Sequence, residues 1–331
     1  MGAAATMRLC LALAAALGAW TLHGAAGVAQ SVAPPTAGVV HQVGPTRALK
    51  LPSDAARIAK DGDTVEIDPT TYEDCAVWRA NGLTLRGKGG VAHVTTKTCQ
   101  GKAIWVIDGD RTTVERIRFT RAAVRDKNGA GIRLTGGTLT VRQSVFEDNE
   151  NGILAGSAAG KTVTIEGSRF ERNGKCEPDC AHGIYINTVD RVVVRDSVFR
   201  GQKIGHHIKS RALSTTVTGT TIEDGADGTA SYLIDLPNGG DALIARNKLQ
   251  KGARSDNRSI AIAYGLEGAR NPAKSVRIEN NVFRSDLPQT TDFVRNGAPN
   301  PMTLRDNALC GLVVPLNGPG TVATSLPCPK P

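Results

Sequence analysis

The sequence predicts an all-β parallel β-helix, in which short strands stack coil on coil into one solenoid. A motif of alternating apolar residues recurs through most of the chain. Gly is abundant at 37 of 331 residues, and aromatic residues make up only 4%. Strands of a few residues cannot bury an apolar face alone, so many small stacked layers fit this composition better than one large globular core.

The first 29 residues are typical of a secretory signal peptide. Arg8 precedes an apolar, Ala-rich run over residues 9–22, which is short for a membrane span, and small residues follow it. We therefore predict a chain exported to the periplasm or secreted, with cleavage after Ala26 or Ala29. Residues 30–49 are predicted as a linker.

The β-helix is predicted over residues 50–310, between two caps. Ser53 is expected to cap a short helix over residues 54–60, and residues 311–331 are expected to form a C-terminal tail or cap. Caps are expected because an open parallel edge would pair with another chain. Three upstream segments already alternate like strands, at residues 63–68, 83–86 and 103–107.

Each repeat combines alternating apolar residues, a small or polar residue and a closing apolar residue. The closing residues lie 23 to 34 positions apart and should form one internal column. They are Phe119, Phe146, Phe170, Phe199, Ile222, Leu249 and Phe283.

A second strand in each coil starts at a small residue, and its alternation defines an inner and an outer face. The inner face is expected to hold Ile184, Ile186, Ile208, Ile234 and Ile262.

Six cysteines lie beyond the signal segment, an even number that favours disulfide bonds in an exported chain. Sequence neighbours are favoured among the possible pairings: Cys75 with Cys99, Cys176 with Cys180, and Cys310 with Cys328. The alternative is a zinc site, which requires paired CxxC-type spacing that the sequence lacks.

One segment carries a family resemblance. Residues 58–67, Ile-Ala-Lys-Asp-Gly-Asp-Thr-Val-Glu-Ile, are followed by Tyr72 and by Asn- and Ser-rich turns. This pattern resembles the pectate-lyase-like superfamily of right-handed β-helix proteins, over most of residues 50–310. The resemblance implies a right-handed solenoid. It implies no single activity, because the superfamily includes polysaccharide lyases, uronan epimerases, glycosidases, esterases, phage depolymerases and binding proteins.

Polar side chains are expected to gather on three successive coils of the solenoid. Alignment of their second strands at the first residue stacks Asn187, Lys209 and Asp235 in one outward column, and Tyr185 with His207 in another. The coils on either side of this patch have small or apolar residues at the same positions, Leu154 and Gly156 on one side and Ala261 and Ala263 on the other. The expected patch is Tyr185, Asn187, His207, Lys209, Arg211 and Asp235, with His182 at the start of the first strand.

These residue types suit β-elimination or C5 epimerisation of a uronate. Arg211 or Lys209 would neutralise the sugar carboxylate, which makes the C5 proton more acidic. Lys209, His207 or Tyr185 would take that proton, and Tyr185 or His207 would protonate the leaving oxygen. Some β-helix lyases use a Lys and an Arg for this work, and the patch is similar to that arrangement in residue type.

The same residues also have structural interpretations. Lys209 and Asp235 would form a common surface ion pair, Asn187 one rung of an amide ladder, and His182 a turn histidine. His206 is expected to point into the core, opposite to His207, so the two imidazoles would not chelate one metal ion.

Several signatures of the superfamily are missing. Asn187-Thr-Val-Asp190 and Gly205-His-His207 only partly match the polygalacturonase motifs, and no Asp-Asp pair or Asp-Pro-His-Asp segment occurs. A calcium ion would have only Asp235 and Asn187 as ligands, which is a thin coordination shell. The sequence therefore requires no cofactor, and calcium is weakly supported.

Two functions remain open. The first is an exported, monomeric enzyme that acts on an acidic polysaccharide as a lyase or epimerase. The second is a non-catalytic β-helix that binds or scaffolds a cell-envelope glycan, which the missing signatures and scarce aromatic residues favour. The formal charge of +9 is dispersed through the repeats, which argues against a nucleic-acid partner.

Overall fold

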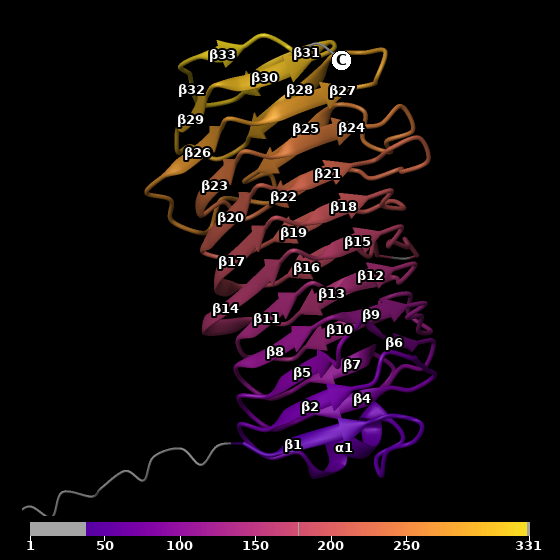
Figure 1. Cartoon of the computed structure of the whole chain (residues 1–331). Helices are drawn as coiled ribbons and strands as arrows, with labels where there is room; N and C mark the ends of the chain where they lie inside the picture. Colours follow the sequence, from indigo (N-terminus) through magenta and orange to yellow (C-terminus); the bar gives the residue numbers. More distant parts are fainter. Residues whose placement is uncertain (1–37, 178, 330–331) are drawn as a thin grey trace, which may run out of the picture. The chain divides into compact units, whose positions relative to one another are not determined.

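The computed structural model describes residues 38–177 and 179–329. The predicted signal peptide and its cleavage site lie outside these residues. The described chain forms three parallel sheets around one apolar core, and each strand except those at the sheet ends pairs with strands of the preceding and following coils (Figure 1). The predicted parallel β-helix is thus confirmed.

The strands of the three sheets are as follows, in spatial order. The 12-stranded sheet contains β1 (Val40–Val43), β2 (Thr64–Ile67), β5 (Thr84–Gly87), β8 (Thr112–Glu115), β11 (Leu139–Arg142), β14 (Ala158–Glu166), β17 (Val189–Arg195), β20 (Ser214–Thr218), β23 (Asp241–Ala245), β26 (Val276–Glu279), β29 (Met302–Arg305) and β32 (Gly320–Val322). The 11-stranded sheet contains β3 (Thr71–Tyr72), β6 (Ala92–Thr95), β9 (Ile117–Thr120), β12 (Val145–Glu147), β15 (Arg169–Glu171), β18 (Val198–Arg200), β21 (Thr221–Glu223), β24 (Lys248–Lys251), β27 (Val282–Ser285), β30 (Asn307–Cys310) and β33 (Ser325–Leu326). The 10-stranded sheet contains β4 (Ala76–Trp78), β7 (Ala103–Ile107), β10 (Ala130–Leu134), β13 (Asn151–Ala155), β16 (Ile184–Ile186), β19 (Ile208–Ser210), β22 (Ile234–Leu236), β25 (Ile260–Tyr264), β28 (Thr291–Asn296) and β31 (Val313–Asn317).

Each copy of the repeat motif is two strands, because the chain bends between the 12- and 11-stranded sheets. The residue at the bend is left-handed, with φ of 46° at Gln143 and 57° at Asn280. From Gln143 onward, the next residue is a buried Ser, Thr or Asn. Its side chain accepts a backbone N–H from the preceding coil, as Ser168 does from Ser144. These ladders satisfy buried amides and so offset the roughly 1–2 kcal/mol that a left-handed residue costs.

The predicted internal column is confirmed. Its four consecutive phenylalanines stack with ring centroids 5.0, 4.7 and 4.5 Å apart, and Ile222, Leu249 and Phe283 continue it in register. Trp105 and Trp78 extend the aromatic column toward the N-terminal end.

The ends of the solenoid differ from the predicted boundaries. The helix α1 (Pro52–Ile58) starts before residue 54, and Ser53 does not cap it. Instead, the Asp54 carboxylate accepts the N–H of Leu51, whereas the Ser53 N–H donates to Asp74. Strand β1 lies in the segment predicted as linker, and β31 to β33 lie in the predicted tail. Terminal strands pair along one edge only, so their alternation is weaker and harder to detect.

The three predicted cysteine pairs lie at disulfide distance. Their Cα atoms are 5.4 Å apart in Cys75–Cys99, 4.0 Å in Cys176–Cys180 and 5.3 Å in Cys310–Cys328. No helix in the described ranges has the length and apolar character that a membrane crossing requires.

Candidate functional site

The 10-stranded sheet brings three of the predicted site residues into one outward column. Tyr185 on β16 pairs with Lys209 on β19, which pairs with Asp235 on β22. The isoleucines predicted on the inner face are fully buried, as expected. Lys209 and Asp235 are 7% and 2% exposed, so this ion pair is not the common surface pair that the structural interpretation assumed.

The predicted register of this column was wrong for Asn187. Tyr185 occupies the place expected for Asn187, because β16 and β19 align at Ile184 and Ile208 and not at their leading glycines. Asn187 follows β16 and donates its side-chain N–H to the Ala155 carbonyl, 3.3 Å away. The amide ladders of this chain run instead through the bends, as between Asn247 and Asn281.

A network of short polar contacts joins the column to Arg211. Lys209 Nζ lies 2.9 Å from Asp235 Oδ2 and 2.7 Å from Glu267 Oε1. Arg211 donates to Glu267 Oε2 at 2.5 Å, to Asn238 Oδ1 at 2.7 Å and to Tyr185 Oη at 3.0 Å. The carboxylate of Glu267 thus bridges the two cations.

Sequence reasoning missed Glu267 and Asn238. Both lie in connections between strands, after β25 and β22, where no periodic pattern marks a side chain as part of a site. Their loops are tied together, since the Glu267 N–H donates to the Pro237 carbonyl and the Asn238 side chain donates to the Gly268 carbonyl.

Both cations are held in their charged form. Burial alone would lower the pKa of Lys209, but the neighbouring Asp235 and Glu267 carboxylates outweigh it and raise that pKa. Burial also opposes the charge of Arg211, and its bonds to Tyr185 and Glu267 raise its pKa. The raised pKa favours the charged form of Lys209 and argues against the role of base considered from the sequence.

A ladder of side chains borders the cations on the same sheet. Asn151 Oδ1 accepts the His182 N–H, His182 Nδ1 accepts the His206 N–H, and His206 Nδ1 accepts the Tyr232 N–H. The His182 ring stacks on His206 at 4.8 Å and meets the Tyr185 ring edge-on at 5.3 Å. His182 is thus next to the site, as predicted.

The two adjacent histidines face opposite to the prediction. His206 lies on the outer side, with Nε2 3.4 Å from Asp235 Oδ2, whereas His207 is 1% exposed and bonds to Asp224 at 2.9 Å. The alternation fails here because the chain turns a corner just before β19, and both His207 and Ile208 point inward. His207 is therefore removed from the site.

Another cation lies in the same outward column, toward the N-terminal end. Arg133 on β10 pairs with Leu154 on β13, which pairs with Tyr185. Among the described residues it forms no direct ion pair. Burial lowers its pKa, and the more distant Asp126 carboxylate partly opposes this. A half-buried arginine with no carboxylate in direct contact suits an anionic ligand.

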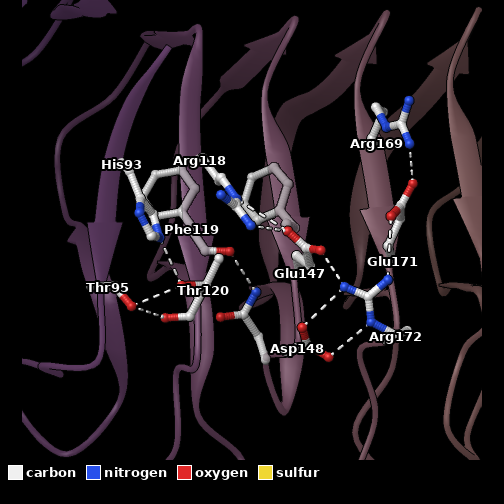
Figure 2. Close-up of polar contacts among 12 residues, drawn as sticks. His93, Thr95, Arg118, Phe119, Thr120, Glu147, Asp148, Arg169, Glu171 and Arg172 are labelled. Atoms are coloured by element: carbon white, nitrogen blue, oxygen red, sulfur yellow. Dashed lines mark hydrogen bonds and ion pairs between the residues drawn. The ribbon is translucent and has the colours of Figure 1, made fainter. Parts of the chain in front are cut away.

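The other outer faces have a different character. Figure 2 shows the 11-stranded sheet, where Arg118 donates to Glu147 at 2.6 Å and Arg172 contacts Glu147 and Asp148. The arginines of these pairs are more than two-fifths exposed, and each pair links neighbouring strands. Such surface ion pairs contribute little stability individually and do not by themselves indicate a functional site. The buried cations of the 10-stranded sheet differ because their desolvation is costly.

A cavity of 760 Å³ lies against the 11-stranded sheet beside Cys310 and Cys328. It contains none of the predicted catalytic or substrate-binding residues, so we attach no function to it. In the site itself, the carboxylate of Glu267 lies between Lys209 and Arg211. Within the described ranges, no group of three or more metal-ligating side chains occurs.

The chain is similar to known β-helix proteins. A family model described as "Right handed beta helix region" matches residues 53–178, and no curated protein matches in sequence at a significant level. The structure is similar to an alginate lyase from Paenibacillus sp. str. FPU-7, with a TM-score of 0.60 and 17% identity over 82% of this chain and 96% of that one. It is also similar to pectate lyase Pel9A, with a TM-score of 0.63 and 14% identity over 88% and 78%. A third similar structure is the A-module of mannuronan C-5 epimerase AlgE6 from Azotobacter vinelandii. Its TM-score is 0.50 and its sequence identity 14%, over 88% of this chain and 89% of that one. These likenesses show the right-handed fold.

Proposed function

We propose that this chain, whose fold is a right-handed parallel β-helix, is an exported enzyme that acts on a uronate-containing polysaccharide by lyase or C5-epimerase chemistry. One observation carries the proposal. Lys209 and Arg211 already hold a carboxylate, that of Glu267, beside the Tyr185 hydroxyl. In this interpretation the Glu267 oxygens occupy the place of the carboxylate of a bound uronate.

The two cations would supply the first requirement of the chemistry. Removal of the C5 proton places negative charge on the uronate carboxyl group, and a buried ammonium and a partly buried guanidinium stabilise that charge more strongly than water does. Asp235 holds Lys209 in place from the next coil at 2.9 Å. The planar guanidinium of Arg211 suits a carboxylate held by two oxygens.

Tyr185 is the remaining group for proton transfer. His207 is buried away from the site and Lys209 is held as a cation, which leaves Tyr185 of the three residues considered. In elimination, the Tyr185 phenolate would take the C5 proton and then give it to the leaving C4 oxygen, while the C5–H and C4–O bonds break and a C4–C5 double bond forms. Arg211 donates to Tyr185 Oη at 3.0 Å and would stabilise the phenolate at the start and end of this cycle. In epimerisation, Tyr185 would take the C5 proton and C5 would receive a proton from solvent on the opposite face.

Three further observations support the proposal. Arg133 offers an additional cation in the same column, as a polyanionic chain requires. The cysteine pairs favour an oxidising compartment, periplasmic or extracellular. The similar solved structures include an alginate lyase, a pectate lyase and a mannuronan epimerase.

The test is a panel of polymannuronate, polyguluronate, polygalacturonate and polyglucuronate, with a neutral glucan as control. Ultraviolet absorbance of unsaturated uronate ends reports elimination, and deuterium uptake at C5 from heavy water reports epimerisation. We expect one or the other with at least one uronan. Binding without turnover would favour a glycan-binding or envelope scaffold protein, and neither binding nor turnover would contradict both functions.

We expect Glu267→Gln to tighten uronan binding. Glu267 is 47% exposed and competes for the cations, so its ion pairs contribute about 0–1 kcal/mol and their loss should lower KM roughly two- to fivefold. The measurement is KM at low ionic strength, with Glu166→Gln on the 12-stranded sheet as the matched control. A raised KM would mean that Glu267 positions the cations and does not compete with the substrate.

A further inference from the structure

The imidazole of His182 has a fixed hydrogen position. Its Nδ1 lies 2.9 Å from the backbone nitrogen of His206, and a backbone N–H can only donate. Nδ1 must therefore present its lone pair, and a neutral ring carries its hydrogen on Nε2. His206 is fixed in the same way by the Tyr232 N–H at 3.1 Å, so the ladder holds both rings in one tautomer.

The Nε2–H of His182 is the unused end of this ladder. His182 is 5% exposed, and its Nε2 has no hydrogen-bond partner in the part of the chain that the structure describes. This atom is not among the buried polar atoms that lack a partner, so it reaches the molecular surface, where a ligand or water can accept its hydrogen. The ring edge lies against Tyr185, at the border of the site formed by Lys209 and Arg211.

The ring is also held neutral. Burial, and then the positive charges of Lys209 and Arg211, lower the pKa of His182 to about 3, while the Glu267 carboxylate acts weakly in the opposite direction. Protonation at Nδ1 would in addition break its bond with the His206 N–H. The donor at Nε2 therefore keeps the same form throughout the pH range in which enzymes work.

We propose that His182 is a neutral hydrogen-bond donor that binds an oxygen of the same sugar residue whose carboxylate Lys209 and Arg211 hold. The inference rests on the proposed function and adds a specificity element to it. The site then recognises a uronate by two cations and one uncharged donor. The tautomer also means that His182 Nε2 is not a metal ligand, because its electron pair is bonded to hydrogen.

The first test needs no substrate. Nitrogen-15 NMR of the histidine side chains, assigned with His182→Gln, reports the tautomer and the pKa of each ring. We expect His182 to carry hydrogen on Nε2 only, because Nδ1 accepts the His206 N–H. We also expect no titration between pH 4.5 and pH 8, because the pKa is about 3. A titration near pH 6.5, or hydrogen on Nδ1, would overturn the proposal whatever the protein acts on.

The second test uses the uronan that the wild type turns over. His182→Phe removes both the acceptor and the donor and should lower kcat/KM by about 10- to 100-fold. His182→Gln can accept from His206 and still donate, and should recover part of that loss. Neither variant should change the shape of the pH profile between about pH 5 and pH 8. Full activity of His182→Phe in a protein whose wild type is active would overturn this proposal alone. An inactive wild type would overturn the proposed function, and the role of His182 with it, while the NMR result would still stand.

Discussion

Arg211→Ala is expected to lower kcat/KM on the preferred uronan by about 10²- to 10³-fold. The reason is the number of contacts that one guanidinium makes, to Glu267, Asn238 and the Tyr185 hydroxyl. Its removal leaves the substrate carboxylate with one cation and leaves the Tyr185 oxygen without its charged donor. The measurement is the initial rate of elimination or deuterium uptake over a range of substrate concentrations.

Two companion variants sharpen this result. Arg211→Lys keeps the charge but not the planar fork, so it should recover only a small part of the activity. Lys209→Ala should lose a similar factor, because the buried ammonium is the other half of the carboxylate site. Arg142→Ala, which removes an ion pair with Glu166 on the 12-stranded sheet, serves as the matched control. Full activity in both Arg211→Ala and Lys209→Ala would remove the site assignment.

Asp224→Ala is expected to lower the free energy of unfolding by about 3–5 kcal/mol. Asp224 is 1% exposed and accepts hydrogen bonds from His207, Ser255 and the Gly252 N–H. Its loss leaves these donors buried without a partner and removes the negative charge that favours protonated Lys251. Chemical denaturation followed by circular dichroism measures the effect. Asp227→Ala, at a side chain that is 91% exposed, is the control and should change stability little. An equal, small change in the free energy of unfolding of both variants would contradict the stabilising role of the Asp224 hydrogen bonds.

The same cluster predicts how stability depends on pH. Burial lowers the pKa of Lys251 to about 8, below its ordinary value of 10.5. Below pH 8 the residue is charged in both the folded and the unfolded chain, and the cost of burying the charge is fully present. Between about pH 8 and pH 10.5 the folded chain releases this proton first, so the Lys251 contribution becomes less unfavourable as pH rises. Lys251→Met should flatten that rise in a comparison of denaturation midpoints, and an unchanged slope would show that Lys251 does not titrate in this window.

The sequence was sufficient for the repeating parts of this protein. Alternating apolar residues, the small or polar residue at each bend and the recurring phenylalanines are local patterns, and stacking reproduces each of them in every coil. They predicted the solenoid and its internal column from Phe119 to Phe283, and cysteine spacing predicted the three pairs at disulfide distance. The column of Lys209 and Asp235 followed from the same alternation.

The sheet with the buried cations was predictable, but the composition of the site was not. The register between β16 and β19 depends on the number of residues in the corner of each coil. Because of that number, Tyr185 and not Asn187 pairs with Lys209, and His207 points inward. Glu267 and Asn238 reach the cations from loops whose paths are set by packing and by backbone hydrogen bonds, not by periodicity. The amino-acid sequence alone therefore determined the β-helix and the outward position of Lys209. Only the tertiary structure decided which neighbours surround that lysine, because contacts between coils depend on turn lengths that no local pattern encodes.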